Sequence, residues 1–292
     1  MMKKEDRSAL ITVFIAVLLG AGLAWAGSQG SVRFAGVPLF ALCVALAFLI
    51  QWLVFIPAYL KQTEKFFDIT GSLTYIVLVL LAGLLSGLAD ARSYLVMLLV
   101  LVWAGRLGSF LFMRVHRAGK DARFDEIKSS FPRFLQTWTL QALWIVFTLA
   151  AALVVLTSTT RLALDVYAYI GLAVWLFGFA FEAIADAQKS AFRKDPKNKG
   201  KFINNGLWSW SRHPNYFGEI TLWVGMALIA LPILRGWQWI ALVSPIFVFF
   251  LLTRVSGIPL LEKHADAKWG GQVDYEVYKS STPVLFPLPL RK

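Results

Sequence analysis

The fold class is decided by an uninterrupted apolar stretch in the first quarter of the chain. Residues 36–60 read GVPLFALCVALAFLIQWLVFIPAYL and contain no charged residue. An α-helix needs roughly 20 such residues to cross a hydrocarbon core about 30 Å thick. Because lipid offers the backbone no hydrogen-bond partners, a spanning segment of this kind is expected to be helical. Residues 134–160 form a second charge-free stretch, so the sequence predicts an all-α integral membrane protein.

Outward from these two stretches, further apolar segments fill most of the chain. Those long enough to cross a membrane, some with help from their flanks, are residues 9–30, 36–60, 69–89, 93–113, 133–160, 164–185, 217–234 and 236–253. Only Arg235 and Gly236 separate the last two segments, which predicts a tight helical hairpin. We expect a multi-spanning bundle of about seven or eight transmembrane helices. We divide it into an N-terminal transmembrane helix (1–35) and a membrane domain (36–292).

The overall composition supports a membrane protein and excludes other classes. Hydrophobic residues make up 58% of the 292 residues and charged residues only 16%, against about 25% charged residues in a soluble domain. Mean hydropathy is +0.63, which excludes a disordered chain. The net charge of +12 fits basic residues gathered on the cytoplasmic side of a membrane, so no nucleic-acid partner is expected. Cys43 is the only cysteine, so neither a disulfide within the chain nor a cysteine-based metal site is expected.

The distribution of positive charge predicts the orientation. With the N-terminus in the cytoplasm, 24 of the 29 Lys and Arg residues fall in cytoplasmic segments, four in external loops and Arg106 inside the fourth span. This asymmetry favours an N-in, C-in integral membrane protein, with any site open to the cytoplasm. An alternative concerns the start of the chain. Lys3, Lys4, the apolar run and Ala24-Trp25-Ala26 resemble a secretory signal peptide with its cleavage site.

The strongest candidate site is the stretch GLWSWSRHPNYFGE at residues 206–219. Pro214 is suited to the first turn of a helix, where its missing N–H costs nothing, and Ser211 or His213 can cap that turn. The amides of a helix start favour an anion such as a phosphate. On the expected helix, Arg212, Asn215 with Tyr216, and Glu219 would share one face. A purely structural helix entry would not need this combination.

Basic and acidic residues near the membrane extend the candidate site. Arg114 and Arg117 lie three positions apart, and such paired guanidinium groups suit phosphate recognition. Contacts with anionic lipids are the alternative explanation for the basic loops. Carboxylates at membrane depth are functional candidates because burying them is costly. Glu64, Asp68 and Asp186 belong to this group.

Residues 206–219 resemble the C-terminal signature of the membrane steroid 5-alpha-reductase family, most closely its bacterial branch. Residues 63–71, 120–127, 260–262 and 274–278 extend the resemblance over roughly residues 50–288. A similar Arg-His-Pro-x-Tyr-x-Gly motif occurs in sterol C=C reductases and in membrane methyltransferases of the isoprenylcysteine and phospholipid types. The resemblance implies that residues 36–292 form a reductase-like domain with NADPH in a cytoplasm-facing cavity. The implied cofactor-binding residues are Arg114, Arg117, Asp186, Arg193, Arg212, His213, Asn215, Tyr216 and Glu219.

The reaction implied by the resemblance is hydride transfer from NADPH to the β-carbon of a conjugated enone in a hydrophobic, steroid-like or lipid substrate that enters from the bilayer. A protonated Glu64 would donate a hydrogen bond to the carbonyl oxygen, and Asp68 would tune it. The best counterparts of the family's substrate-binding residues are Gln62, which is offset in position, and Trp103. The family has a Tyr where this chain has Trp103, and indole cannot act as an acid. This departure puts steroid specificity in doubt.

Two other functions stay open. The first is an S-adenosylmethionine-dependent membrane methyltransferase that uses the same helix-start motif. The basic residues favour NADPH over this cofactor, because S-adenosylmethionine carries no phosphate. The second is a lipid-binding or transport protein, which would leave the motif unexplained. The sequence indicates neither a metal site nor an oligomeric state.

Overall fold

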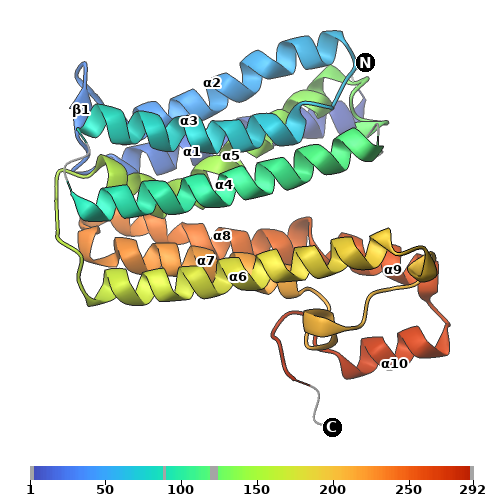
Figure 1. Ribbon diagram of the computed structural model, residues 1–292. Helices are drawn as coiled ribbons and strands as arrows, with labels where there is room; N and C mark the ends of the chain where they lie inside the picture. The colour runs from blue at the N-terminus through green and yellow to red at the C-terminus, as the bar shows by residue number, and fades with distance from the viewer. Residues whose placement is uncertain (1–2, 88–89, 119–123, 290–292) are drawn as a thin grey trace. The chain divides into compact units, whose positions relative to one another are not determined.

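The computed structural model describes residues 3–87, 90–118 and 124–289, with the backbone alone for residues 110–118. Within these residues, eight helices are long and apolar enough to cross a membrane, which confirms the predicted all-helical integral membrane protein (Figure 1). The spans are Lys4–Gly27, Leu39–Leu60, Phe67–Ser86, Ala91–Ser109, Phe131–Thr157, Val166–Lys194, Pro214–Ile233 and Gly236–Trp269.

The chain forms two compact units. Unit 1 comprises Met1–Ala168 and Ile229–Ser244, and unit 2 comprises Tyr169–Leu228 and Pro245–Lys292. Each unit therefore consists of two separate segments of the chain, one that begins before the seventh span and one that continues beyond it. The boundary expected between residues 35 and 36 stays a prediction.

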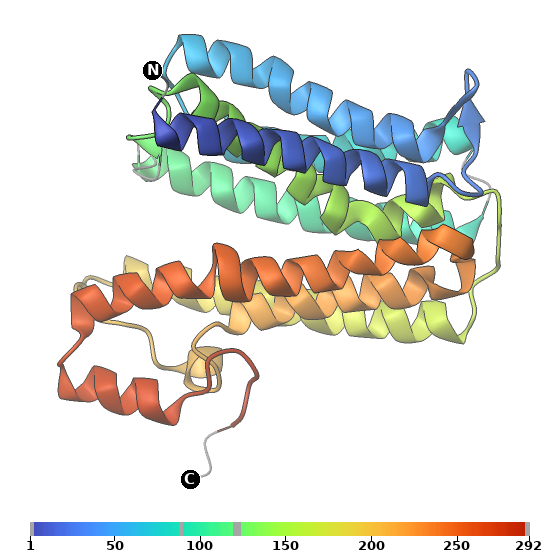
Figure 2. The same cartoon turned by 180° about the vertical axis from the view of Figure 1, so that it is seen from behind.

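Unit 1 is built around one central helix, α5 (Phe131–Thr157). It packs against α1 (Lys4–Gly27), α2 (Leu39–Leu60) and α3 (Phe67–Ser86), as both views of the ribbon show (Figures 1 and 2). Its alanines at positions 150, 151 and 152 are fully buried. Helix association in lipid depends on close van der Waals packing, and small side chains allow that approach.

A short hairpin joins α1 to α2 in unit 1. Strands β1 (Arg33–Phe34) and β2 (Val37–Pro38) are antiparallel, with Arg33 opposite Pro38 and Phe34 opposite Val37. The two turn residues, Ala35 and Gly36, both have positive φ, at 49° and 82°. A two-residue turn of this kind matches the right-handed twist of paired strands.

A buried arginine joins three segments of unit 1. Arg92, in α4 (Ala91–Ala118), is fully buried. Its guanidinium donates to the carbonyl oxygens of Ile229 (2.7 Å) and Ala163 (2.8 Å) and pairs with Asp165 at 2.9 Å. One side chain thus satisfies two backbone acceptors where water is scarce.

Unit 2 contains two helices whose backbones nearly touch, α6 (Val166–Lys194) and α7 (Pro214–Ala230). A Cβ atom added to Gly218 would lie 2.5 Å from the Glu182 nitrogen and 2.6 Å from the Gly178 oxygen. One added to Gly178 would lie 2.5 Å from the Leu222 nitrogen. Glycine at both positions therefore sets the distance between the two helices.

The last span differs from the predicted hairpin helix over residues 236–253. It starts as a 3-10 helix (Gly236–Leu242) and continues through α8 (Val243–Phe250) and a π-helical turn (Leu251–Val255). After a break at Gly257 it continues as α9, Ile258–Trp269 (Figure 2). The π-helical turn and Pro259 near the start of α9 account for the interruption. The helix α10 (Val273–Ser281) then completes the tail.

Candidate functional site

The helix start at Pro214 lies where the sequence predicts it. The contacts of the three preceding residues, Ser211, Arg212 and His213, differ from the predicted ones. The His213 carbonyl oxygen accepts from the amides of Tyr216 (3.1 Å) and Phe217 (3.2 Å). The Ser211 hydroxyl accepts from the His213 amide (3.1 Å) and donates to the Leu285 carbonyl oxygen (2.9 Å). Arg212 precedes α7, because the helix begins only at Pro214. The prediction that Arg212 shares a helical face with Asn215 and Glu219 is therefore wrong.

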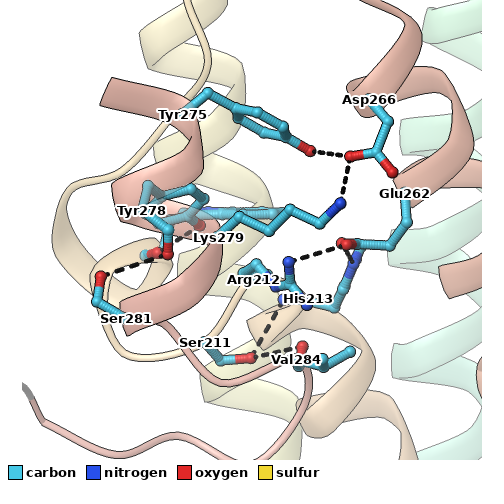
Figure 3. A network of polar contacts seen from close by, with 11 residues as sticks. Ser211, Arg212, His213, Glu262, Asp266, Tyr275, Tyr278, Lys279, Ser281 and Val284 are labelled. Atoms are coloured by element: carbon cyan, nitrogen blue, oxygen red, sulfur yellow. Dashed lines mark hydrogen bonds and ion pairs between the residues drawn. The ribbon is translucent and has the colours of Figure 1, made fainter. Parts of the chain in front are cut away.

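Arg212 and His213 converge on one carboxylate from α9. His213 Nε2 lies 2.7 Å from Glu262 Oε1, and an Arg212 guanidinium nitrogen lies 3.0 Å from Glu262 Oε2 (Figure 3). The two basic side chains are only 6% and 12% exposed. An ionised carboxylate can only accept hydrogen bonds. Glu262 Oε1 therefore faces a ring nitrogen at hydrogen-bond distance, and Oε2 has an ion-pair partner.

This arrangement determines the state of the His213 ring. Burial lowers the pKa of His213 below its usual 6.5, while the hydrogen bond to Glu262 opposes part of that effect. The ring is therefore neutral at neutral pH, and its proton lies on Nε2, which faces Glu262. Nδ1 is buried and has no hydrogen-bond partner among the described residues. It is a buried acceptor whose hydrogen-bonding capacity these residues leave unused.

The tail is folded against the same stretch. Asp266 accepts from the Tyr275 hydroxyl (2.9 Å) and from Lys279 Nζ (2.6 Å), as Figure 3 shows. The Tyr278 hydroxyl donates to the Trp208 carbonyl oxygen (2.8 Å). The hydrogen bond to Asp266 raises the pKa of Lys279, and burial raises the pKa of Tyr278. These contacts fix α10 next to the helix-start motif with Lys279 charged and Tyr278 protonated.

The motif, α6, α9 and α10 line an open cavity of about 240 Å³ in unit 2. Its cationic lining residues are Lys189, Arg193, Lys201, Arg212 and Lys268. Its aromatic lining residues are Phe192, Phe202, Trp208, Trp269, Tyr275 and Tyr278. His213 also lines it, and Glu262 is the single carboxylate in this lining of described residues. The cavity therefore offers flat apolar faces, an excess of positive charge and one half-buried carboxylate.

Two of the cations already lie against aromatic rings of the cavity. Lys189 Nζ is 4.2 Å from the centre of the Trp208 ring, and Lys268 Nζ is 4.7 Å from that of Trp269. Contacts of this kind are attractive because the ring face carries partial negative charge. They hold the cationic side chains at the walls of the cavity.

The predicted cofactor residues are brought together only in part. Arg193, Arg212 and His213 line the cavity. The Asn215 amide donates to the Asp186 carboxylate (3.3 Å), and the Tyr216 ring stacks on His213 at 5.7 Å and 9°. These three residues, and Glu219 in α7, are not among the described residues that line the cavity. The side chains of Arg114 and Arg117 lie outside the described residues, so their proposed contacts stay predictions.

The predicted catalytic and substrate residues belong to unit 1. Glu64 is 3% exposed and pairs with Lys128 Nζ at 2.9 Å, and that hydrogen bond raises the pKa of Lys128. The pairing stabilises an ionised Glu64, whereas the reductase reaction needs the protonated form. Asp68 is half-buried in the first turn of α3. Gln62 is exposed and donates to the Tyr59 carbonyl oxygen (2.7 Å), and Trp103 packs edge-to-face on Tyr75 at 4.9 Å.

Several cavity residues were not predicted from the sequence. Glu262 lies in the stretch Leu260–Glu262 and the two tyrosines in Asp274–Tyr278. Both stretches carry part of the family resemblance, but the sequence assigns no role to either. Lys189 and Trp208 could be read as membrane-interface residues. In the part of the chain that the structure describes, no group of three or more His, Cys, Asp or Glu side chains is placed to hold a metal ion.

The fold and the cavity define a multi-spanning helical membrane protein with a polar, aromatic-walled pocket next to a helix start. The chain belongs to the family described as "Protein of unknown function (DUF1295)", which matches residues 54–282.

Two relatives extend the comparison. "Uncharacterized protein C594.04c" of Schizosaccharomyces pombe is 23% identical over 235 residues, 70% of this chain and 66% of that protein. "Probable O-methyltransferase ustE" of Ustilaginoidea virens is 38% identical over 63 residues, 21% of this chain and 22% of that protein. Neither name refers to a steroid reductase. No solved structure matches the chain.

Proposed function

We propose that this protein is a membrane methyltransferase that binds S-adenosylmethionine in the unit 2 cavity and acts on an apolar acceptor dissolved in the bilayer. The observation that carries the proposal is the cavity itself, where the carboxylate of Glu262 and several aromatic faces line one space. The similarity to a probable O-methyltransferase supports it. Membrane lipids are the surrounding medium and the expected source of the acceptor.

The residues present fit this cofactor in size and chemistry. The cavity of about 240 Å³ is small beside ligand pockets of roughly 300–1,000 Å³, and S-adenosylmethionine is about half the size of NADPH. Aromatic faces such as Trp208 and Tyr275 suit both a planar base and a sulfonium cation. The unpartnered Nδ1 of His213 can accept from a hydroxyl or amine of the cofactor.

Each group of side chains has a defined part in this proposal. The guanidinium of Arg212 or Arg193 can bind the carboxylate of the cofactor. The aromatic walls exclude water from the bound molecule. S-adenosylmethionine, when bound, supplies an electrophilic methyl group. The protein's contribution is binding and orientation, which alone can lower a barrier substantially.

An NADPH-dependent reductase is the second candidate, and one observation favours it. Lys189, Arg193 and Lys201 all line the cavity, and clustered cations suit the 2′-phosphate of NADPH. Under this candidate Glu64 and Asp68 keep their predicted catalytic role, and Gln62 and Trp103 their role in binding substrate. The ion pair between Glu64 and Lys128 weighs against it, because it stabilises the ionised form of Glu64.

The test is calorimetric binding of S-adenosylmethionine, S-adenosylhomocysteine, NADPH and NADP⁺ to the full chain in detergent. We expect the two S-adenosyl compounds to bind, and Glu262→Gln to weaken that binding. Arg133→Ala is the matched control, because Arg133 is a partly exposed arginine of unit 1 that pairs with Glu5. Binding of NADPH alone, weakened by Arg193→Ala, would replace the methyltransferase with the reductase. Labelled S-adenosylmethionine and extracted membrane lipids then test methyl transfer.

A further inference from the structure

We propose that Glu262 is a positioning residue that holds His213 in the Nε2–H tautomer, so that Nδ1 accepts a hydrogen bond from an N–H or O–H group of the ligand in the cavity. The proposal rests on the proposed function only for the identity of that ligand. The tautomer itself is a property of the protein alone.

The contacts of Glu262 fix its charge state and its position. One oxygen faces His213 Nε2 at 2.7 Å and the other faces Arg212 at 3.0 Å. Arginine stays charged and can only donate, so the carboxylate beside it is ionised and can only accept. The nitrogen at 2.7 Å must therefore carry a proton, which leaves the lone pair of a neutral ring on Nδ1.

Contacts around the His213 ring fix its orientation. The His213 amide donates to the Ser211 hydroxyl at 3.1 Å, and the Tyr216 ring stacks on the imidazole at 9°. Only 6% of the side chain is exposed. A half-turn of the ring would place the carbon Cε1 where Nε2 now faces Glu262 and would break that contact, so the orientation is well determined.

Burial of the ring favours its neutral form. Burial lowers the pKa of His213 most strongly, Glu262 from α9 opposes this by attracting a proton, and Lys189 from α6 and Arg212 from the preceding loop act in the same direction as burial. Nδ1 therefore keeps its lone pair, yet it has no donor among the described residues. Because buried acceptors are rarely left without a donor, a ligand in the cavity that His213 lines is the natural source of one.

The tautomer can be read directly from ¹⁵N spectra of the ligand-free full chain in detergent, labelled on its three histidines. The His213 signals are those that disappear in His213→Asn. We expect an unprotonated Nδ1 and a protonated Nε2 in the wild-type protein. Glu262→Gln should give a mixture, because an amide can either donate to Nε2 or accept from it. A protonated Nδ1 in the wild type, or a tautomer that Glu262→Gln leaves unchanged, overturns the proposal.

Ligand-binding measurements test whether the tautomer of His213 affects the affinity for the ligand. The test ligands are S-adenosylhomocysteine and NADP⁺. With the one that binds, Glu262→Gln should lower affinity about tenfold in the wild-type background and less than about twofold in His213→Asn. Asparagine carries polar atoms at the distance from the backbone at which histidine carries Nδ1, and it does not extend to Glu262. An equal loss in both backgrounds shows that Glu262 acts on the ligand directly and overturns the proposal.

Asp266→Asn is the control, because it weakens the neighbouring contacts with Tyr275 and Lys279 and leaves the Glu262 contacts intact. Thermal unfolding of each variant identifies any that fails to fold. If neither test ligand binds, the proposed function fails, while the ¹⁵N spectra still decide whether Glu262 sets the tautomer.

Discussion

The two units use buried polar groups in opposite ways. In unit 1 the Gln51 amide donates to the Thr74 hydroxyl at 2.9 Å, and Arg92 donates to two backbone carbonyl oxygens. In unit 2, Arg212, His213 and Glu262 gather at the wall of a cavity. Polar groups are costly in a membrane protein wherever they lack partners. In unit 1 these polar groups join helices, whereas in unit 2 several of them line a cavity that a ligand can fill.

The largest effect should follow from separating α6 and α7 in unit 2. Gly218→Leu places a side chain where backbone atoms of Glu182 and Gly178 already lie within 2.6 Å of an added Cβ. Backbone cannot move aside as a side-chain tip can, so we expect a loss of about 3 kcal/mol or more. Thermal unfolding in detergent measures it, and ligand binding should be lost as well.

Gly22→Leu is the matched control, because a Cβ at Gly22 in α1 meets nothing within 4 Å. Leucine is also a better helix former than glycine, by about 1 kcal/mol or less. Similar destabilisation by both substitutions would mean that the close approach of α6 and α7 does not limit the fold of unit 2.

A somewhat smaller effect is expected from Arg92 in unit 1. Arg92→Met leaves the carbonyl oxygens of Ile229 and Ala163 without this donor, at a cost of about 2–4 kcal/mol. Because the residue belongs to the joining network of unit 1, ligand affinity should stay unchanged. Arg33→Met is the control, since Arg33 is exposed and bonds only locally, to Gly36. A large loss of affinity with little loss of stability would contradict the structural role.

Substitutions in the ion pair between Glu64 and Lys128 test whether unit 1 also contains a catalytic residue. Glu64→Gln should lower stability by about 1 kcal/mol, because Lys128 is 22% exposed and partly solvated. The double variant Glu64→Gln with Lys128→Met should recover part of that loss. Since the folded pKa of Lys128 is raised, the stabilisation is complete below its ordinary pKa and is lost as pH rises through the folded value. Abolished turnover with unchanged stability would instead restore Glu64 as a catalytic residue.

The spans could be predicted because hydropathy is a property of local sequence. The expected span 36–60 became α2 at Leu39–Leu60, and 133–160 became α5 at Phe131–Thr157. The predicted end of the sixth span at residue 185 fell short of Lys194. The last turns of α6 carry Lys189 and Arg193, whose polarity hides a helix that continues beyond the apolar segment.

Only part of the candidate site could be predicted from the sequence, for a different reason. The stretch around Pro214 has a local signature, so its helix start was predicted correctly. Glu262 lies 49 positions away from His213, and nothing in the spacing of a lone carboxylate shows which residue it will contact. The break at Gly257, which precedes α9, was equally hidden. A Cβ at this position would lie 2.5 Å from the Leu252 carbonyl oxygen and 2.8 Å from the Tyr216 ring, so both the preceding π-helical turn and a contact with α7 require glycine there.

The smallest effect, and the one most specific to unit 2, is the response of stability to pH. The folded pKa of His213 lies below its ordinary 6.5, so the unfolded chain binds the proton more tightly. Stability from this residue is complete above about 6.5 and falls as pH drops through that value toward the folded pKa. Unfolding midpoints at about pH 7.5 and pH 5.5 should therefore differ less in His213→Asn than in the wild type.

Glu262→Gln makes the pH prediction sharper, because Glu262 opposes the lowering that burial, Lys189 and Arg212 produce. Without that carboxylate the folded pKa should fall further, so the loss of stability between the same two pH values should grow. If Glu262→Gln flattens the response instead, the carboxylate itself is the titrating group. The ring of His213 would then not be the neutral acceptor on which the cavity's proposed chemistry depends.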